Sequence, residues 1–97
     1  MPTYVMLAKF TQKGAEEVKG GPGRLAEARQ GARARGAEIK AFYLVMGRYD
    51  AVIIVEAPND EVAAQGALAA ASRGFIRTET LRAFTEDEVK KLVAGLP

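Results

Sequence analysis

Residues 38–57 read EIKAFYLVMGRYDAVIIVEA, and this stretch decides the fold. Apolar, aromatic and β-branched side chains fill its two halves, 38–46 and 49–57, and this composition is typical of β-strands. Gly47 and Arg48 stand between the halves, and a two-residue connection with glycine first is typical of a tight hairpin. The stretch therefore predicts two antiparallel strands joined by a two-residue turn.

The flanking sequence predicts one more strand on each side and helices between the strands. Residues 4–10 (YVMLAKF) and 75–84 (FIRTETLRAF) have the composition of strands. Helical segments are predicted over about 13–19, from Pro22 to Arg35 after a break at GGPG (20–23), from Asn59 or Asp60 onward, and after the capping box Thr85–Glu88. The order β-α-β-β-α-β with an extra C-terminal helix predicts a single α+β domain over residues 1–97. Its expected fold is ferredoxin-like, an antiparallel four-stranded sheet with helices on one face.

Both faces of the predicted sheet are apolar, although the two main helices cover only one. A half-solvated sheet alternates apolar and polar residues, whereas Val52 and Ile54 point opposite to Ile53 and Val55. In the same way, we expect Val5 and Leu7 opposite Met6 and Ala8, and Phe42 opposite Ile39. Four strands about 4.8 Å apart and roughly 20 Å long present an apolar face of about 400 Å² in plan area. A bare apolar face of about this area is at or above what monomers usually expose. A second copy packed face to face about a two-fold axis would cover it. We therefore expect a homodimer or a higher homo-oligomer; the alternative is that the C-terminal helix folds back over the face.

The composition excludes several kinds of active site. The chain has no cysteine and no histidine. This excludes disulfides, thiolate nucleophiles, a Ser-His-Asp triad and His-ligated zinc or haem, and we expect no cofactor and no metal. A net charge of +2 does not by itself indicate a nucleic-acid partner. Without an apolar run of about 18 residues or a signal-peptide pattern, the expected location is cytoplasmic, with no membrane segment.

The segment MGRYD (46–50) carries the most chemistry in the chain, and two interpretations stand side by side. In the structural one, Gly47 supplies a positive φ, Asp50 bonds backbone N–H groups near the turn and Tyr49 packs beside the sheet. In the functional one, Arg48 anchors an anion and Asp50 acts as an acid or base. The structural interpretation is favoured, and it leaves Arg48 alone free for function.

The last strand offers a second candidate site. Arg77 and Glu79 share one face of it, and Thr78 lies on the other. These polar groups either keep a sheet edge from aggregating or line a cavity. Taken together, the candidate ligand-binding residues are Tyr43, Arg48, Tyr49, Asp50, Thr78 and Glu79.

Three separated blocks resemble the GYD domain family, named for a Gly-x-Tyr-Asp element. The blocks are MPTYV (1–5), AFYLVMGRYDAVIIVEAPNDE (41–61) and RTETLRAFTEDE (77–88). The resemblance implies a dimeric α+β barrel, in which two ferredoxin-like sheets pack together. The family has no established reaction, so the resemblance identifies no catalytic residue.

From these observations we expect a homo-oligomeric module that binds a small molecule or has a regulatory role. Its ligand would lie between the sheet and the helices or at the subunit interface. The alternative is a small cofactor-independent enzyme, an oxygenase or isomerase. In that case Asp50, Glu56 or Glu79 would be the base, in an apolar cavity that raises its pKa.

Overall fold

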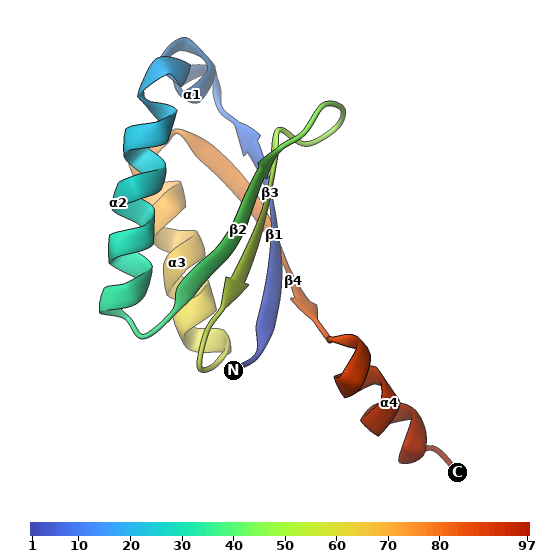
Figure 1. Cartoon of the computed structure of the whole chain (residues 1–97). Coiled ribbons are helices and arrows are strands. Elements are labelled where there is room, and N and C mark those ends of the chain that lie inside the picture. Colours follow the sequence, from blue (N-terminus) through green and yellow to red (C-terminus); the bar gives the residue numbers. More distant parts are fainter.

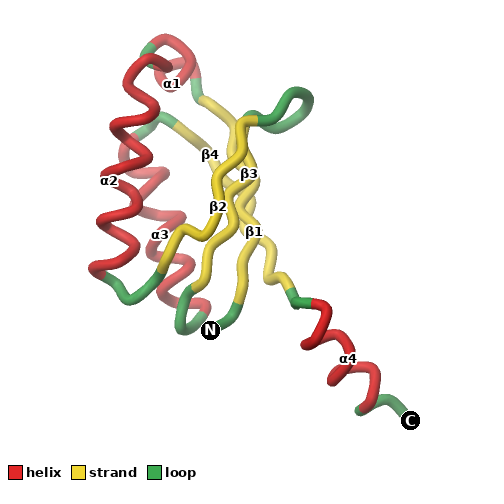
Figure 2. Tube along the Cα trace, in the orientation of Figure 1, coloured by secondary structure: helices red, strands yellow, loops and turns green.

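The computed structural model describes residues 1–97 and shows an antiparallel four-stranded sheet with two long helices on one face (Figure 1, Figure 2). The elements are β1 (Thr3–Phe10), α1 (Gln12–Glu16), the 3₁₀ turn η1 (Val18–Gly20), α2 (Gly21–Ala34), β2 (Glu38–Leu44), β3 (Ala51–Glu56), α3 (Asp60–Arg73), β4 (Ile76–Ala83) and α4 (Glu86–Ala94). The strand order is β2-β3-β1-β4, with every neighbouring pair antiparallel. This is the ferredoxin-like arrangement, and the predicted fold class is confirmed. None of the helices is both long and apolar enough to span a bilayer.

The buried core lies between the sheet and helices α2 and α3. Alternate residues of the central strands β1 and β3 supply most of it, and the helices add alanines. The buried residues are Tyr4, Met6, Ala8, Ala51, Ile53, Val55, Ala32, Ala37, Ala57 and Ala63. The predicted alternation on both central strands is confirmed, because Val5, Leu7, Val52 and Ile54 belong to the opposite face.

Strand β2 departs from the predicted alternation at one point. Ile39 pairs with Val55, but the next pair joins Ala41 to Ile54, so Lys40 is one extra residue on β2. Such a bulge shifts the face on which the following side chains lie. Ile39 and Phe42 therefore both face the helices, and the expectation that they lie on opposite faces is wrong.

The helix boundaries follow local capping chemistry. The Asn59 side chain accepts a hydrogen bond from the backbone N–H of Val62 at 2.9 Å, which confirms Asn59 as the N-cap of α3. Helix α2 begins at Gly21, with Pro22 in its first turn, where a proline needs no hydrogen-bonding N–H. The break predicted at GGPG is therefore shorter than expected, since a 3₁₀ turn over Val18–Gly20 leads directly into α2.

Helix α4 projects past the end of β4, away from both the sheet and the other helices (Figure 1). It does not fold back over the open face of the sheet, so that alternative is not what the structure shows. Both halves of the predicted capping box are formed. The backbone N–H of Thr85 donates to Glu88 Oε1 at 2.8 Å, and that of Glu88 donates to Thr85 Oγ1 at 3.2 Å.

This capping box makes the helicity of α4 dependent on pH. The hydrogen bonds from the backbone N–H and then the side chain of Thr85 lower the pKa of Glu88 below its ordinary value. The cap is therefore complete above the ordinary glutamate pKa and is lost as the pH falls through the lowered value. We expect the protection factors of the α4 amides, which compare each exchange rate with the intrinsic rate at the same pH, to fall at acidic pH before those of the sheet. We expect Thr85→Ala to raise exchange at neutral pH, with a loss of about 1 kcal/mol of helix stability.

Candidate functional site

The connection between β2 and β3 is longer than the sequence suggests. The strands end at Leu44 and resume at Ala51, so residues 45–50 form a six-residue loop and the predicted two-residue hairpin is wrong. Gly47 does have the expected positive φ, at +131°. The loop closes through a hydrogen bond from the Val45 N–H to the Asp50 carbonyl oxygen at 2.9 Å. It extends beyond the sheet on the side away from α2 and α3 (Figure 1).

The pairing of β2 with β3 ends before the Gly47 turn because Asp50 forms hydrogen bonds with β1. The Asp50 N–H donates to the carbonyl oxygen of Ala8, and the Phe10 N–H donates to Asp50 Oδ2, each at 2.8 Å. Asp50 therefore satisfies backbone groups at the end of a central strand. This confirms the structural interpretation of Asp50. The backbone N–H that its carboxylate binds belongs to Phe10, forty positions away in the sequence.

We expect Asp50→Ala to destabilise the protein and Arg48→Ala to leave its stability unchanged. The first change leaves the Phe10 N–H without its charged acceptor, and such hydrogen bonds contribute about 1.5–3 kcal/mol. Arg48 is exposed and takes part in none of the ion pairs. Urea unfolding of the two variants measures the difference. Equal stabilities for Asp50→Ala and the parent chain would contradict the structural role.

Tyr49 and Glu79 meet at the loop end of the open face. The Tyr49 hydroxyl donates to Glu79 Oε1 at 3.4 Å, and Lys9 Nζ lies 5.8 Å from the centre of the Tyr49 ring. A hollow of about 210 Å³ is lined here by Leu7, Lys9, Tyr49, Arg77, Thr78 and Glu79. Three of the six predicted ligand-binding residues therefore lie around one small polar hollow.

The other three predicted residues lie apart from this hollow. Tyr43 is 60% exposed on β2, at the opposite edge of the sheet from Glu79. Arg48 lies in the solvent-exposed part of the loop, and Asp50 is occupied by the backbone of β1. The structure thus does not gather the six residues into one pocket. That they bind a ligand stays a prediction.

The face of the sheet opposite the helices is uncovered, and its centre is apolar. It carries Val5 and Leu7 of β1, Val52 and Ile54 of β3, Ala41 and Tyr43 of β2, and Leu81 of β4. We call these seven residues the open face. The expected second apolar face is thus present, and helices α2 and α3 lie on the other side of the sheet (Figure 2).

Charged residues of like sign stand next to one another at two corners of the open face. Glu38 pairs directly with Glu56 across β2 and β3, and Lys9 pairs directly with Arg77 across β1 and β4. The register places the two pairs at diagonally opposite corners, because Glu56 lies beside Thr3 at the other end of β1 from Lys9. Like charges directly opposite each other destabilise a sheet. Glu79 lies in the same hollow as Lys9 and Arg77 and balances part of their charge, so the acidic corner favours a partner of opposite charge more strongly than the basic corner does.

Helix α4 adds a second uncovered apolar surface. Val89, Leu92 and Val93 are exposed and recur at helical spacing, as predicted from the sequence. Leu81 and Phe84, at the end of β4, are also exposed and lead from the open face to this helix. The apolar surface of the sheet thus continues along the C-terminal segment.

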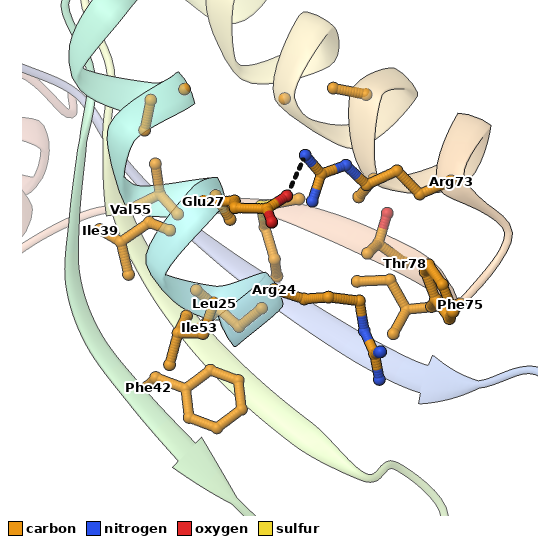
Figure 3. A pocket seen from close by; sticks show the side chains of 18 of the residues that line it. Arg24, Leu25, Glu27, Ile39, Phe42, Ile53, Val55, Arg73, Phe75 and Thr78 are labelled. Carbon is orange, nitrogen blue, oxygen red and sulfur yellow. Dashed lines mark ion pairs between the residues drawn. The ribbon is translucent and has the colours of Figure 1, made fainter. Parts of the chain in front are cut away.

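A large cavity lies on the helix side of the sheet (Figure 3). It has a volume of about 490 Å³ and is lined by 27 residues, 18 of them hydrophobic, from the sheet, α2 and α3. Its one acidic lining residue is Glu27, whose side chain is 63% exposed and lies 2.9 Å from the guanidinium of Arg73. Asp50, Glu56 and Glu79 do not line it. The cavity therefore offers no buried carboxylate for the enzyme alternative.

Tyr4 is the one buried titratable side chain with a marked shift. It is 3% exposed, and its hydroxyl donates to Asp60 Oδ1 in the first turn of α3. This hydrogen bond, and next the burial, raise the pKa of Tyr4 above the ordinary tyrosine value. The associated stability is complete below the ordinary tyrosine pKa and is lost only as the pH rises through the raised value. The hydrogen bond between Tyr4 and Asp60 therefore links α3 to the sheet throughout the neutral pH range.

Comparison with known proteins identifies the family of this chain. The GYD domain family matches residues 4–93 of the chain. The chain belongs to the GYD domain family. This GYD chain is 40% identical over 97 residues to a Thermus thermophilus protein named "Glutamine synthetase and cystathionine beta-lyase binding protein", and the match covers 99% of both chains. No solved structure matches the GYD chain significantly.

The sequence indicated the space between the sheet and the helices as one of two places for a ligand, but it did not identify the residues that line this cavity of the GYD chain, although a signal was present. Alanine and glycine dominate α3, and we expect such a helix to pack closely on its neighbour. In the structure, the short side chains of α2 and α3 instead leave space above the sheet, with Ala28, Gly31, Ala63 and Gly66 among the lining residues. Small residues on a helix thus indicate either close packing or an unfilled space, and only the helix-to-sheet distance distinguishes them.

Proposed function

We propose that this GYD protein is a homodimeric regulatory module that binds an enzyme of amino-acid metabolism. The observation that carries the proposal is the full-length similarity to a protein named for binding glutamine synthetase and cystathionine β-lyase. The structure supports a binding role through its uncovered apolar surfaces on the sheet and on α4. The enzyme alternative has an apolar cavity in its favour, but no buried carboxylate among the residues that line this cavity.

The first support for the dimer is the area of the open face, an apolar surface that a second copy would remove from water. Four strands about 4.8 Å apart and roughly 20 Å long give the open face a plan area of about 400 Å². A standard stable interface buries about 800 Å² on each partner. The accessible area of the open face exceeds its plan area, and the exposed apolar side chains of α4 add to the surface that a second copy could cover. A second copy that receives α4 as well as the open face therefore fits both surfaces.

The dimer is supported next by the charged corners of the open face. A two-fold axis lying in the interface along the uncharged diagonal brings Glu38 and Glu56 of one copy over Lys9 and Arg77 of the other. The strands of the two sheets then cross at nearly a right angle, which is one of the two common ways in which sheets pack. Each like-charged pair thereby gains opposite charges from the second copy.

We expect reversal of either corner to weaken the dimer and reversal of both to restore it. The variant Glu38→Lys/Glu56→Lys has basic residues at both corners, and Lys9→Glu/Arg77→Glu has acidic residues at both. Each should raise the dimer dissociation constant at least about tenfold, because like charges placed together in an interface are costly. Sedimentation at low ionic strength measures this, and a mixture of the two variants should form heterodimers. A fourfold variant weaker than either double variant would refute the arrangement.

Binding to a metabolic enzyme is tested with purified proteins. Glutamine synthetase and cystathionine β-lyase from the host organism are immobilised separately, with an unrelated enzyme of similar charge as the control. Biolayer interferometry should show saturable binding of the GYD protein to at least one of them, and enzyme activity should change on binding. If neither enzyme binds at micromolar concentration, the regulatory proposal is refuted. The proposed dimer is not affected by that result.

A further inference from the structure

We infer that the cavity between the sheet and helices α2 and α3 is a binding site for a small molecule with an apolar body and one anionic head group, such as a fatty acid. This site lies on the helix side of the sheet, away from the open face. The inference therefore goes beyond the proposed function and does not depend on the dimer or on an enzyme partner.

The size of the cavity sets it apart from ordinary packing defects. Protein interiors contain few voids larger than a water molecule, whereas this space measures about 490 Å³. Small-molecule sites have volumes of about 300–1,000 Å³. The space exists because both helices present residues without long side chains to the sheet. These lining residues are Ala28, Gly31 and Ala32 of α2, and Ala63, Gly66, Ala69 and Ala70 of α3.

The walls of the cavity suit an apolar body. Phe42 and Ile53 reach into it from the sheet, and Leu25 reaches into it from α2 (Figure 3). At the β4 side the Phe75 ring closes the wall, with the guanidinium of Arg24 at 4.0 Å from the ring centre. Arg24 is occupied there, since it also donates to the carbonyl oxygen of Glu17 at 2.8 Å. An aliphatic chain would remove this apolar surface from water.

The charged groups of the cavity favour an anion. Its lining contains three arginines against one acid, and that acid, Glu27, pairs with Arg73. Arg35 is left without an ion-pair partner, and its Nε is buried with no hydrogen bond. A buried donor without an acceptor is unfavourable, and a carboxylate can accept two parallel hydrogen bonds from one guanidinium.

Arg35 also lies where a head group can reach it from the cavity. Arg35 Nη1 lies 3.7 Å from the position that a Cβ would take at Gly31 of α2. Arg35 Nη2 lies 3.7 Å from the corresponding position at Gly66 of α3. The guanidinium is thus held between the two helices, at a position where neither neighbour has a side chain. An apolar ligand that enters between α2 and α3 can place its carboxylate on Arg35.

The test uses decanoate and its uncharged analogue decan-1-ol as probes, with binding to the full chain followed by calorimetry or NMR titration. Decanoate should bind at least about tenfold more tightly than decanol, which corresponds to one charge-assisted contact. Arg35→Gln should abolish that difference, while Arg33→Gln, in the last turn of α2 but not in the cavity lining, should preserve it. Absence of decanoate binding, or equal affinity for the two probes in the parent chain, would overturn the inference.

A second pair of variants locates the probe in the cavity without changing any charge. Ala28→Phe places a ring in the cavity and should lower the affinity for decanoate at least about tenfold. Ala26→Phe makes the same change on α2 at a position that does not line the cavity, and should have no effect. Thermal unfolding confirms that both variants fold. Equal decanoate binding by the two variants would place the probe elsewhere and would refute the site.

Discussion

Replacing Ile54 by Lys is expected to convert the proposed dimer to a monomer while leaving each chain folded. Ile54 lies at the centre of the open face, between Val5 of β1 and Ala41 of β2. In a two-fold dimer the change acts twice. Each buried isoleucine contributes about 1.5–3 kcal/mol, so the dissociation constant should rise at least a hundredfold even before the cost of burying a charge. The monomer tolerates lysine because this face is open to solvent there.

Sedimentation velocity over a range of concentrations measures the effect of Ile54→Lys. The matched control is Leu68→Lys on α3, since Leu68 is 69% exposed and does not line the cavity. That variant should sediment as the parent dimer does, and circular dichroism should show the same fold for all three chains. A parent chain that is monomeric at micromolar concentration, or an Ile54→Lys variant that stays dimeric, would disprove the dimer.

Replacing Gly14 by Ala is expected to cause the largest loss of stability of any glycine-to-alanine change in the chain. Gly14 is buried in α1, and a Cβ there would overlap the carbonyl oxygen of Phe75 at the start of β4. That carbonyl cannot move freely, because it accepts the N–H of Thr11 at 3.0 Å. Overpacking usually costs about 1–3 kcal/mol, and a clash with fixed backbone belongs at the upper end of that range.

Gly23→Ala is the control for Gly14→Ala. Gly23 is a helical residue of α2, and nothing lies within 4 Å of its added Cβ. Alanine should therefore stabilise the protein there, by up to about 1 kcal/mol, through its higher helix propensity. Chemical denaturation of both variants gives the two changes in free energy of unfolding. If Gly14→Ala is as stable as the parent chain, the contact between α1 and β4 is looser than the structure shows.

The positions of the strands followed from the sequence because they depend on local patterns. The alternation of Val52 and Ile54 against Ile53 and Val55 was sufficient to predict both faces of β3. The capping side chains of Asn59 and Thr85 were also predictable, because each bonds a residue three positions away. Patterns of this range need no knowledge of the rest of the fold.

The details around the candidate site depend on contacts between distant residues, and here the sequence was less informative. Asp50 opens the β2–β3 loop because it bonds the backbone of Phe10 on a different strand. The bulge at Lys40 places Ile39 and Phe42 on the same face of the sheet. No glycine or proline lies at the bulge that would have indicated it in the sequence. Thr78 and Glu79 lie beside Lys9 because β1 and β4 are neighbours in the sheet, and Tyr49 reaches them because β3, which follows its loop, lies on the other side of β1.

The sequence by itself determined the order of the elements, the two apolar faces of the sheet and the caps of its helices, since these arise from the spacing of side chains along the chain. Only the tertiary structure decided the direction of α4 and the space beneath α2 and α3. Both depend on how far one element lies from another, and short side chains such as Ala28 and Gly66 are compatible with either a close contact or a cavity. The MGRYD segment shows the same division, because its glycine could be interpreted locally, whereas the role of Asp50 required its partner on β1.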